Sequence, residues 1–173
     1  MSGFNFTPFP LLTSEKLVLR QLRVGDAEQL FKLRADDRVN QYIDRPKMQA
    51  QKEAENFILK MNKSVAENSC IYWAITVPGK DELVGTMCLW NFSEDGSSGE
   101  VGYELMPDFW GNGIVSAGLA LVIDYARELL GLSILKACIK PENEPSLRLV
   151  KQFGFEKRRQ AKCGDVYEMA LTQ

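Results

Sequence analysis

The stretch that most constrains this chain runs from Glu100 to Ala126, where a strand pattern, a glycine-containing loop and an amphipathic helix pattern follow directly on one another. Residues 101–105 alternate larger apolar side chains with glycine and glutamate, which is the period of two expected of a strand. Pro107 ends this run because it lacks an N–H donor. Apolar residues then recur at helical spacing from about Gly113, so a long helix is predicted.

Gly111 and Gly113 lie between that strand and that helix. Glycine lets the backbone turn sharply, and a helix start adds free N–H groups and the positive end of the helix dipole. The loop is therefore expected to bind a phosphate-like anion. Two nucleotide-binding patterns do not fit. The P-loop needs Gly-Lys-Ser or Gly-Lys-Thr, which is absent, and the dinucleotide fingerprint needs a third glycine where this chain has Ser116.

The composition is that of an ordinary globular protein, with 173 residues, 45% hydrophobic side chains and a net charge of −2. We expect one domain over residues 1–173, in which residues 1–14 form an irregular arm because of their prolines. No nucleic-acid-binding surface is predicted, since the only basic cluster, residues 157–159, is typical of a solvated strand end. No apolar run of about 18 residues and no signal peptide are found, which predicts a cytoplasmic protein without a membrane partner.

The four cysteines, Cys70, Cys88, Cys138 and Cys163, are widely spaced and are expected to be reduced core residues. The chain contains no histidine. This excludes a Ser-His-Asp or Cys-His nucleophile and a zinc site with histidine ligands, and no metal is predicted. Proton transfer must therefore use carboxylates, hydroxyls, amines or water.

The remaining elements follow from periodicity and from turn residues. The strand at 134–139 is separated from the one at 101–105 by a helix, so the two are expected to be parallel through a right-handed crossover. The other strands are expected to form an antiparallel meander. The predicted strands are 16–23, 70–77, 83–92, 101–105, 134–139, 155–160 and 166–171. One helix is predicted to follow an N-cap at Asp26 and another to begin near Gly113. Two more helices are predicted over residues 49–66 and 143–153.

The run from Gly102 to Ala117 resembles the acyl-CoA loop of the GNAT superfamily of N-acetyltransferases. Asn143 to Ser146, followed by Phe153 to Phe155, resembles the next motif of that superfamily. The opening at Leu17 to Leu22, of the LxLRxL type, resembles the branch of ribosomal-protein N-terminal acetyltransferases. The resemblance implies an α/β fold with a mixed, mostly antiparallel, splayed sheet of about six to seven strands flanked by about four helices.

The resemblance also implies that acetyl-CoA lies between the diverging strands, with its pyrophosphate on the loop amides. Two positions depart from the family pattern. Val115 stands where the family has glycine or alanine, and Asn112 replaces a common lysine or arginine. Trp110 is ordinary for the resembled branch. The implied cofactor-binding residues are Leu105, Met106, Trp110, Gly111, Asn112, Gly113, Ile114, Val115, Ser116, Asn143 and Ser146.

Acyl transfer needs a polarised thioester carbonyl, a proton for the thiolate and a neutral amine. We expect a backbone N–H at Leu105 or Met106 to donate to the oxyanion, and Ser146, by family resemblance, to protonate the thiolate. Ser146 could instead be a first-turn helix hydroxyl bonded to backbone. Glu104 and Glu100 are the candidate bases, and the alternative for both is a solvated strand edge. Tyr103 is expected in the core.

The resulting hypothesis is an acetyl-CoA-dependent N-acetyltransferase that transfers acetyl to a primary amine by direct attack. A peptide N-terminal α-amine is favoured, since its pKa of about 7.7 to 8.0 leaves it partly neutral at pH 7 without a histidine base. The alternatives are a small-molecule amine and a non-catalytic CoA-binding module, in a monomer or a homodimer. Asp36, Asp37 and Asp44 would favour a cationic acceptor if they faced the cleft, and otherwise form a solvated helix end.

Overall fold

The computed structural model describes residues 3–172, which form one eight-stranded sheet in the order β1-β2-β3-β4-β5-β6-β8-β7. Neighbouring strands are antiparallel except β5 and β6, which are parallel as predicted. One strand more is present than the seven predicted, a two-residue pairing within the arm expected to be irregular. The strands are β1 Leu12–Thr13, β2 Val18–Gln21, β3 Ile71–Thr76, β4 Gly85–Trp90, β5 Ser98–Leu105, β6 Ile134–Ile139, β7 Glu156–Ala161 and β8 Gly164–Ala170.

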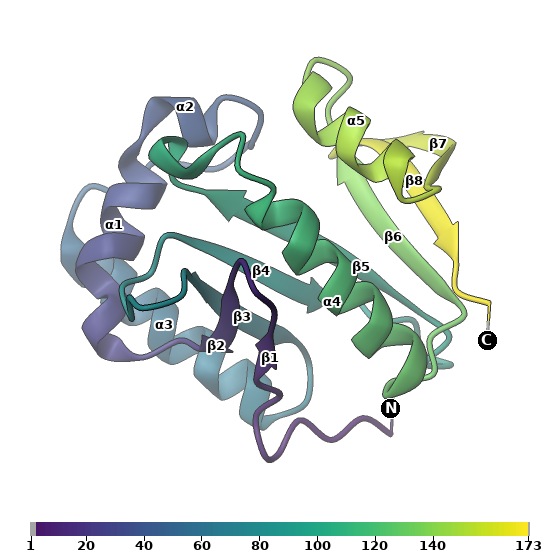
Figure 1. Cartoon of the computed structure of the whole chain (residues 1–173), viewed down its shortest axis with the longest axis horizontal. Coiled ribbons are helices and arrows are strands. Elements are labelled where there is room, and N and C mark those ends of the chain that lie inside the picture. Colours follow the sequence, from purple (N-terminus) through teal and green to yellow (C-terminus); the bar gives the residue numbers. More distant parts are fainter. Residues whose placement is uncertain (1–2, 173) are drawn as a thin grey trace.

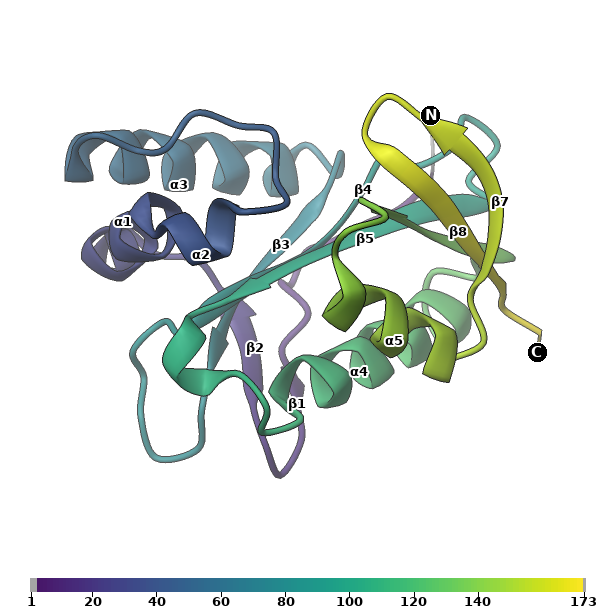
Figure 2. The same ribbon diagram turned by 90° about the horizontal axis from the view of Figure 1, so that it is seen from above.

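The helices lie on both faces of this sheet (Figures 1 and 2). Figure 2 shows α1 and α3 on one face and α4 and α5 on the other. The four predicted helices are present, and the additional one, α2, is a single turn capped by the Asp36 carboxylate, which accepts a bond of 2.8 Å from the Arg38 N–H. The helices are α1 Ala27–Ala35, α2 Asp37–Asn40, α3 Gln51–Ala66, α4 Ile114–Glu128 and α5 Glu144–Gln152.

Helix α4 packs closely on the sheet and forms the larger core. Leu119, Val122 and Ala126 of this helix are fully buried. A Cβ at Gly118 would lie 3.0 Å from Met87 Cε and 3.1 Å from Leu17 Cδ1, which is tighter than ordinary side-chain contact. The helix has a residue of poor helix propensity here because the Met87 and Leu17 side chains approach its backbone closely.

A second core lies on the opposite face, under α1 and α3. Leu30 and Leu33 of α1 pack with Ile58 of α3, and all three are fully buried. This core holds α1 and α3 against the sheet, which matters because α1 and the loop after α2 carry side chains of the candidate site. No helix in residues 3–172 is long and apolar enough to cross a membrane.

Two of the four cysteines form a disulfide, so the prediction of four reduced cysteines is wrong for this pair. Cys138 of β6 is bonded to Cys163 in the turn between β7 and β8. The two are 25 residues apart in sequence, but β6 pairs with β8 and brings the turn next to Cys138. Cys70 and Cys88 are free, as predicted.

Candidate acyl-CoA cleft

A cleft opens where β5 and β6 diverge. Ser98 to Glu100 pair with Ile134 to Lys136, and beyond these residues the two strands share no ladder. Figure 1 shows β5 and β6 close together at one end and fanning apart toward α5. The space between and around them is a cavity of about 1240 Å³. The splayed sheet predicted from the sequence is therefore present, and it leaves backbone groups of both strands without strand partners.

The loop before α4 presents unpaired N–H groups. Gly113 adopts the left-handed conformation, with φ of 72°, and no side chain caps the helix start. The first α-helical bond at this start runs from the Ala117 N–H to the Gly113 carbonyl at 3.0 Å. The N–H groups of residues 114–116 are therefore left without helical partners, as expected for the first turn of a helix. Such a start favours an anion.

The structure shows the surroundings of Val115 and Asn112, the two positions that depart from the family pattern. The half-buried Val115 side chain packs against the hydrophobic core, so its bulk does not remove its backbone N–H from the loop. Lys16, in the connection between β1 and β2, brings its ammonium to the loop and donates to the Asn112 carbonyl at 3.2 Å. The same Lys16 Nζ would lie 2.8 Å from a Cβ at Gly113. A cation therefore reaches the loop from another part of the chain.

The backbone N–H groups of Leu105 and Met106, the two candidates for the oxyanion, differ in whether they are already hydrogen-bonded. The Met106 N–H donates to the Val84 carbonyl at 2.8 Å, so it is not free, and its assignment as an oxyanion donor is wrong for this conformation. Leu105 is paired in register with Gly85. Because N–H directions alternate along an antiparallel strand, the N–H of Leu105 points away from β4 and toward the gap. The Leu105 carbonyl accepts a bond of 2.8 Å from Trp110 Nε1.

Two hydroxyl groups meet on the α5 side of the cleft. Asn143 caps α5, and its side-chain oxygen accepts a bond of 3.3 Å from the Ser146 N–H. Ser146 therefore lies in the first turn of α5 beside the cleft, where Tyr103 of β5 also lies. The Tyr103 hydroxyl is buried and has no hydrogen-bond partner among residues 3–172. Burial raises the pKa of Tyr103, and the nearby Ser146 side chain opposes this shift.

Glu104 lies on the opposite side of β5 and is almost completely buried, with a side chain 6% exposed. Its Oε1 accepts bonds from Arg34 Nε at 3.3 Å and from the Thr86 hydroxyl at 3.1 Å, and its Oε2 accepts a bond from Arg45 Nη2 at 2.5 Å. Burial works against the ionised carboxylate, but the charges of Arg34 and Arg45 outweigh it and lower the pKa of Glu104. Both carboxylate oxygens are engaged.

Glu100 is not brought together with Glu104. It lies four residues earlier on the same strand, about 13 Å away along the chain. Its Oε2 accepts a bond of 3.1 Å from Asn91 Nδ2 at the surface, and it does not line the cleft. Glu100 and Glu104 therefore share a strand face but not a site.

Sequence reasoning missed several residues that line or approach the cleft. Arg34 and Arg45 reach Glu104 from 70 and 59 residues away in the chain, so no local spacing signals them. Lys16 belongs to the predicted first strand, and nothing in the sequence places it near Asn112. From the alternating pattern, Tyr103 was predicted only as a core residue of its strand. Its buried hydroxyl without a hydrogen-bond partner is seen only in the structure, where β5 and β6 diverge.

Comparison with known proteins settles the family. Residues 16–156 match the acetyltransferase (GNAT) domain model. The chain belongs to the GNAT acetyltransferase family. This GNAT protein is 33% identical over 149 residues to the uncharacterized N-acetyltransferase YoaA of Bacillus subtilis, over 86% of this chain and 84% of YoaA. It is 30% identical over 170 residues to the uncharacterized N-acetyltransferase p20 of Bacillus licheniformis, over 94% and 96% of the two chains.

Among solved structures, this GNAT protein is similar to the ribosomal L7/L12 α-N-protein acetyltransferase RimL in complex with coenzyme A. The TM-score is 0.81 at 19% identity, over 94% of this chain and 98% of RimL. The family and the fold class predicted from the sequence are thus confirmed, and the chain is an acetyltransferase. Residues 3–172 contain no group of three or more His, Cys, Asp or Glu side chains that could hold a metal ion.

Proposed function

We propose that residues 1–173 work as a single, cytoplasmic domain that transfers acetyl from acetyl-CoA to a primary amine by direct attack. A peptide N-terminal α-amine is the favoured acceptor. One observation carries the proposal: the uncapped start of α4 lies beside the open edge of β5, so that an anion site adjoins an unpaired strand. All the residues assigned below belong to one chain, so a monomer or a homodimer can carry the site.

The loop holds the cofactor in this proposal. The N–H groups of residues 113–116 bind the pyrophosphate, and the Lys16 ammonium contributes a positive charge beside them. Trp110, Gly111 and Asn112 shape the loop that leads into these amides. Asn143 faces the pantetheine arm while its side-chain oxygen caps α5, and its amide nitrogen remains available as a donor. Acetyl-CoA supplies the acetyl group as an activated thioester.

The residues around the gap polarise the carbonyl and supply a proton. The Leu105 N–H points into the gap, and we assign it to the developing oxyanion, where a pre-oriented donor is worth about 3 kcal/mol in the transition state. As the C–S bond breaks, we assign protonation of the departing thiolate to Ser146, which regains a proton from solvent water, with the neighbouring Tyr103 hydroxyl as a second donor. Tyr103 is supported by its buried, unpartnered hydroxyl, since such a group is normally hydrogen-bonded in a complete site.

Glu104 acts on the amine indirectly in this proposal. A general base needs a free lone pair and a pKa near the working pH, whereas the Glu104 oxygens are engaged and its pKa is lowered. We therefore propose Glu104 as a positioning residue for Arg34 and Arg45. Their two positive charges against one negative charge disfavour a protonated amine nearby, so that water can accept its proton. Glu100 does not line the cleft and is the weaker candidate base.

The test is calorimetric titration with acetyl-CoA together with a thiol-release assay. Gly113→Leu should weaken binding about tenfold or more, because it disturbs several amide contacts worth about 1 kcal/mol each. Gly79→Leu is the matched control, since Gly79 has φ of 81° and open space around its Cβ position. Both variants place leucine at a positive φ, so they differ in what the new side chain meets, which is the loop and Lys16 at position 113 and open space at position 79.

The outcomes separate the alternatives. Equal acetyl-CoA affinity in Gly113→Leu and Gly79→Leu would remove the loop assignment. Binding without thiol release over a panel of peptides, amino acids and polyamines would favour the non-catalytic CoA-binding module. Thiol release with polyamines but not with peptides would favour a small-molecule acetyltransferase.

A further inference from the structure

The cluster around Glu104 holds more positive than negative charge. Arg34 and Arg45 share the single carboxylate of Glu104, with N–O distances of 3.3 Å and 2.5 Å. The side chains are only 13%, 19% and 6% exposed for Arg34, Arg45 and Glu104. Because a buried charge is costly without a counter-charge, the formal excess of one positive charge indicates that an anion completes the cluster.

The two guanidinium groups are held rigidly and still have donors to spare. Arg34 stacks on the Phe57 ring at 4.0 Å and donates from Nη2 to the Tyr72 hydroxyl at 2.9 Å. Arg45 donates from Nε to Asn40 Oδ1 at 2.9 Å. The Nη1 atoms of both arginines have no hydrogen-bond partner in residues 3–172, and neither is sealed from solvent. Both arginines line the cleft, so an acceptor can reach these donors.

The surrounding charges do not cancel this excess. At the rim, Arg38 pairs with Asp36 at 2.8 Å and Lys140 with Asp44 at 2.5 Å, which makes both pairs neutral. Arg148 lies 3.7 Å from Glu144 in an exposed pair. Among the described residues, Glu104 is the only carboxylate that lines the cleft.

The aspartates considered for a cationic acceptor are all engaged elsewhere. Asp36 and Asp44 form the rim pairs, and Asp37 pairs with Lys47 at 2.6 Å. None of the three lines the cleft. A cationic acceptor such as a polyamine therefore meets two arginines and no free carboxylate.

We propose that the acceptor is an amine that also carries a carboxylate, and that Arg34 and Arg45 bind that carboxylate through their Nη1 donors. This inference rests on the proposed acetyl transfer and names its substrate class. The carboxylate can belong to an acidic side chain next to a peptide N-terminus or to a free amino acid. A fixed arginine fork suits a planar carboxylate, and the bond is charge-assisted.

The test compares acceptors with and without the carboxylate, and expresses kcat/KM per neutral amine, because a neighbouring carboxylate also raises the pKa of an amine. One pair consists of a peptide beginning Ala-Glu and the same peptide beginning Ala-Gln, and the other consists of a free amino acid and its amide. We expect kcat/KM from thiol release to be about 10- to 100-fold higher for the carboxylate member of at least one pair, the effect of a charge-assisted bond. The pair that responds identifies the source of the carboxylate. Ratios near one, or below one, in both pairs would overturn the proposal.

Variants link the preference to the arginines. Arg45→Gln should reduce the carboxylate preference about tenfold or more, whereas Arg159→Gln, a surface change on β7, should leave it unchanged. Arg45→Lys keeps a positive charge but loses the fork, and should retain part of the preference. A preference that persists unchanged in Arg45→Gln and Arg34→Gln would contradict the assignment.

Two further measurements keep the test decisive. If the arginine variants do not fold, the acceptor pairs on the unaltered protein still decide the proposal. If no acceptor turns over, calorimetric titration of the same pairs into the CoA-saturated protein replaces the rate, and equal affinities within each pair would overturn it. The calorimetric titration with acetyl-CoA alone is a separate measurement. If acetyl-CoA does not bind there, the proposed function is overturned, whatever the acceptor pairs show.

Discussion

At the scale of single residues, Glu104 shows how a pattern can place a side chain without revealing its environment. Alternation along residues 101–105 predicts its strand and its face, and both are present. The sequence does not reveal that two arginines cover it, since these come from α1 and from the loop after α2. Glu104, a candidate base from the sequence, is therefore a buried carboxylate paired with Arg34 and Arg45 in the structure.

Glu104→Gln should lower the free energy of unfolding at pH 7 by about 3 kcal/mol, because it leaves two buried guanidinium groups without a counter-charge. Turnover should fall while acetyl-CoA affinity is retained. The pKa of Glu104 is lowered in the folded protein, so its contribution is complete above the unfolded value of about 4.3 and is lost as the pH falls through the lower folded value. The stabilities of the variant and the unaltered protein should therefore converge in acid.

Urea unfolding at pH 7 and at about pH 3 measures this difference. Glu100→Gln is the matched control for stability, because it makes the same chemical change on the same face of β5 but outside the cleft, and it should change the free energy of unfolding little. A constant difference between Glu104→Gln and the unaltered protein across this pH range would contradict the buried ion pairs.

At the scale of elements, the geometry of the loop before α4 was predictable because its determinants are local. Gly111 and Gly113 both adopt positive φ, and the helix follows directly, as the spacing indicated. Lys16 was not predictable in this role, since it comes from the connection between β1 and β2, 96 residues from Asn112. A departure from a motif can therefore be offset by a residue that only the tertiary structure brings near.

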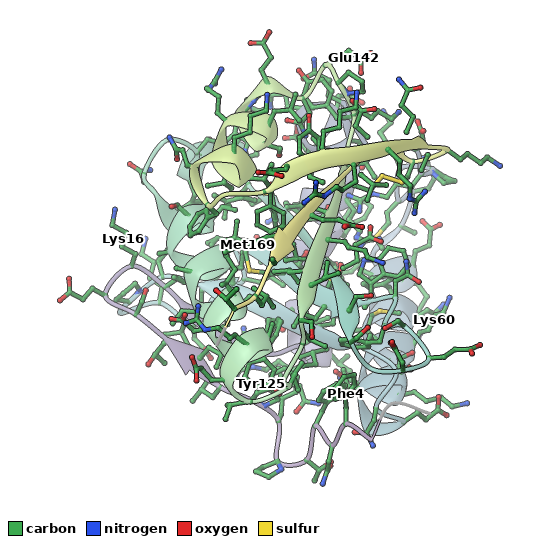
Figure 3. The ribbon with its side chains drawn as sticks, turned by 90° about the vertical axis from the view of Figure 1, so that its right-hand side faces the viewer. Phe4, Lys16, Lys60, Tyr125, Glu142 and Met169 are labelled. Carbon is green, nitrogen blue, oxygen red and sulfur yellow. A yellow bond between two sulfur atoms is a disulfide. The ribbon has the colours of Figure 1, made fainter. Side chains whose placement is uncertain are left out.

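Lys16→Gln should weaken acetyl-CoA binding about fivefold, as expected for one exposed charge near a phosphate. The loss should shrink at high salt, because screening weakens the interaction in the unaltered protein. Lys60→Gln is the control, since Lys60 lies on α3, away from Lys16 (Figure 3). Calorimetric titration at low and high salt checks the effect, and equal affinity of the two variants would show that Lys16 does not meet the cofactor.

At the scale of the whole molecule, the order of the strands was largely predictable, since each carries its own period and turn residues. The two features that were not predicted depend on contacts between distant segments. β1 forms because two residues of the arm meet β2. The Cys138–Cys163 bond forms because β8 lies beside β6. Widely spaced cysteines give no local signal for pairing, so composition alone favoured reduced thiols.

The disulfide should stabilise the oxidised protein by about 3 kcal/mol, the effect expected for closing a loop of 25 residues. Cys163→Ser should lower the unfolding free energy by that amount, and a reducing agent should do the same to the unaltered protein but not to the variant. Cys88→Ser provides the control, because Cys88 is free. Thermal unfolding with and without dithiothreitol measures both, and an unaltered protein that ignores the reductant would argue against the bond.

The narrow contact between β5 and β6 divides the sheet into two unequal plates. One plate contains β1 to β5 with α1, α2 and α3, and the other contains β6 to β8 with α5. Only three residue pairs join the plates through the ladder, and the rest of their connection is the larger core, in which Leu119 of α4 and Leu135 of β6 are buried together. The Cys138–Cys163 bond stiffens the smaller plate but not this connection. Beyond these three pairs, β5 and β6 are therefore held apart and in place by side-chain packing rather than by backbone hydrogen bonds between them.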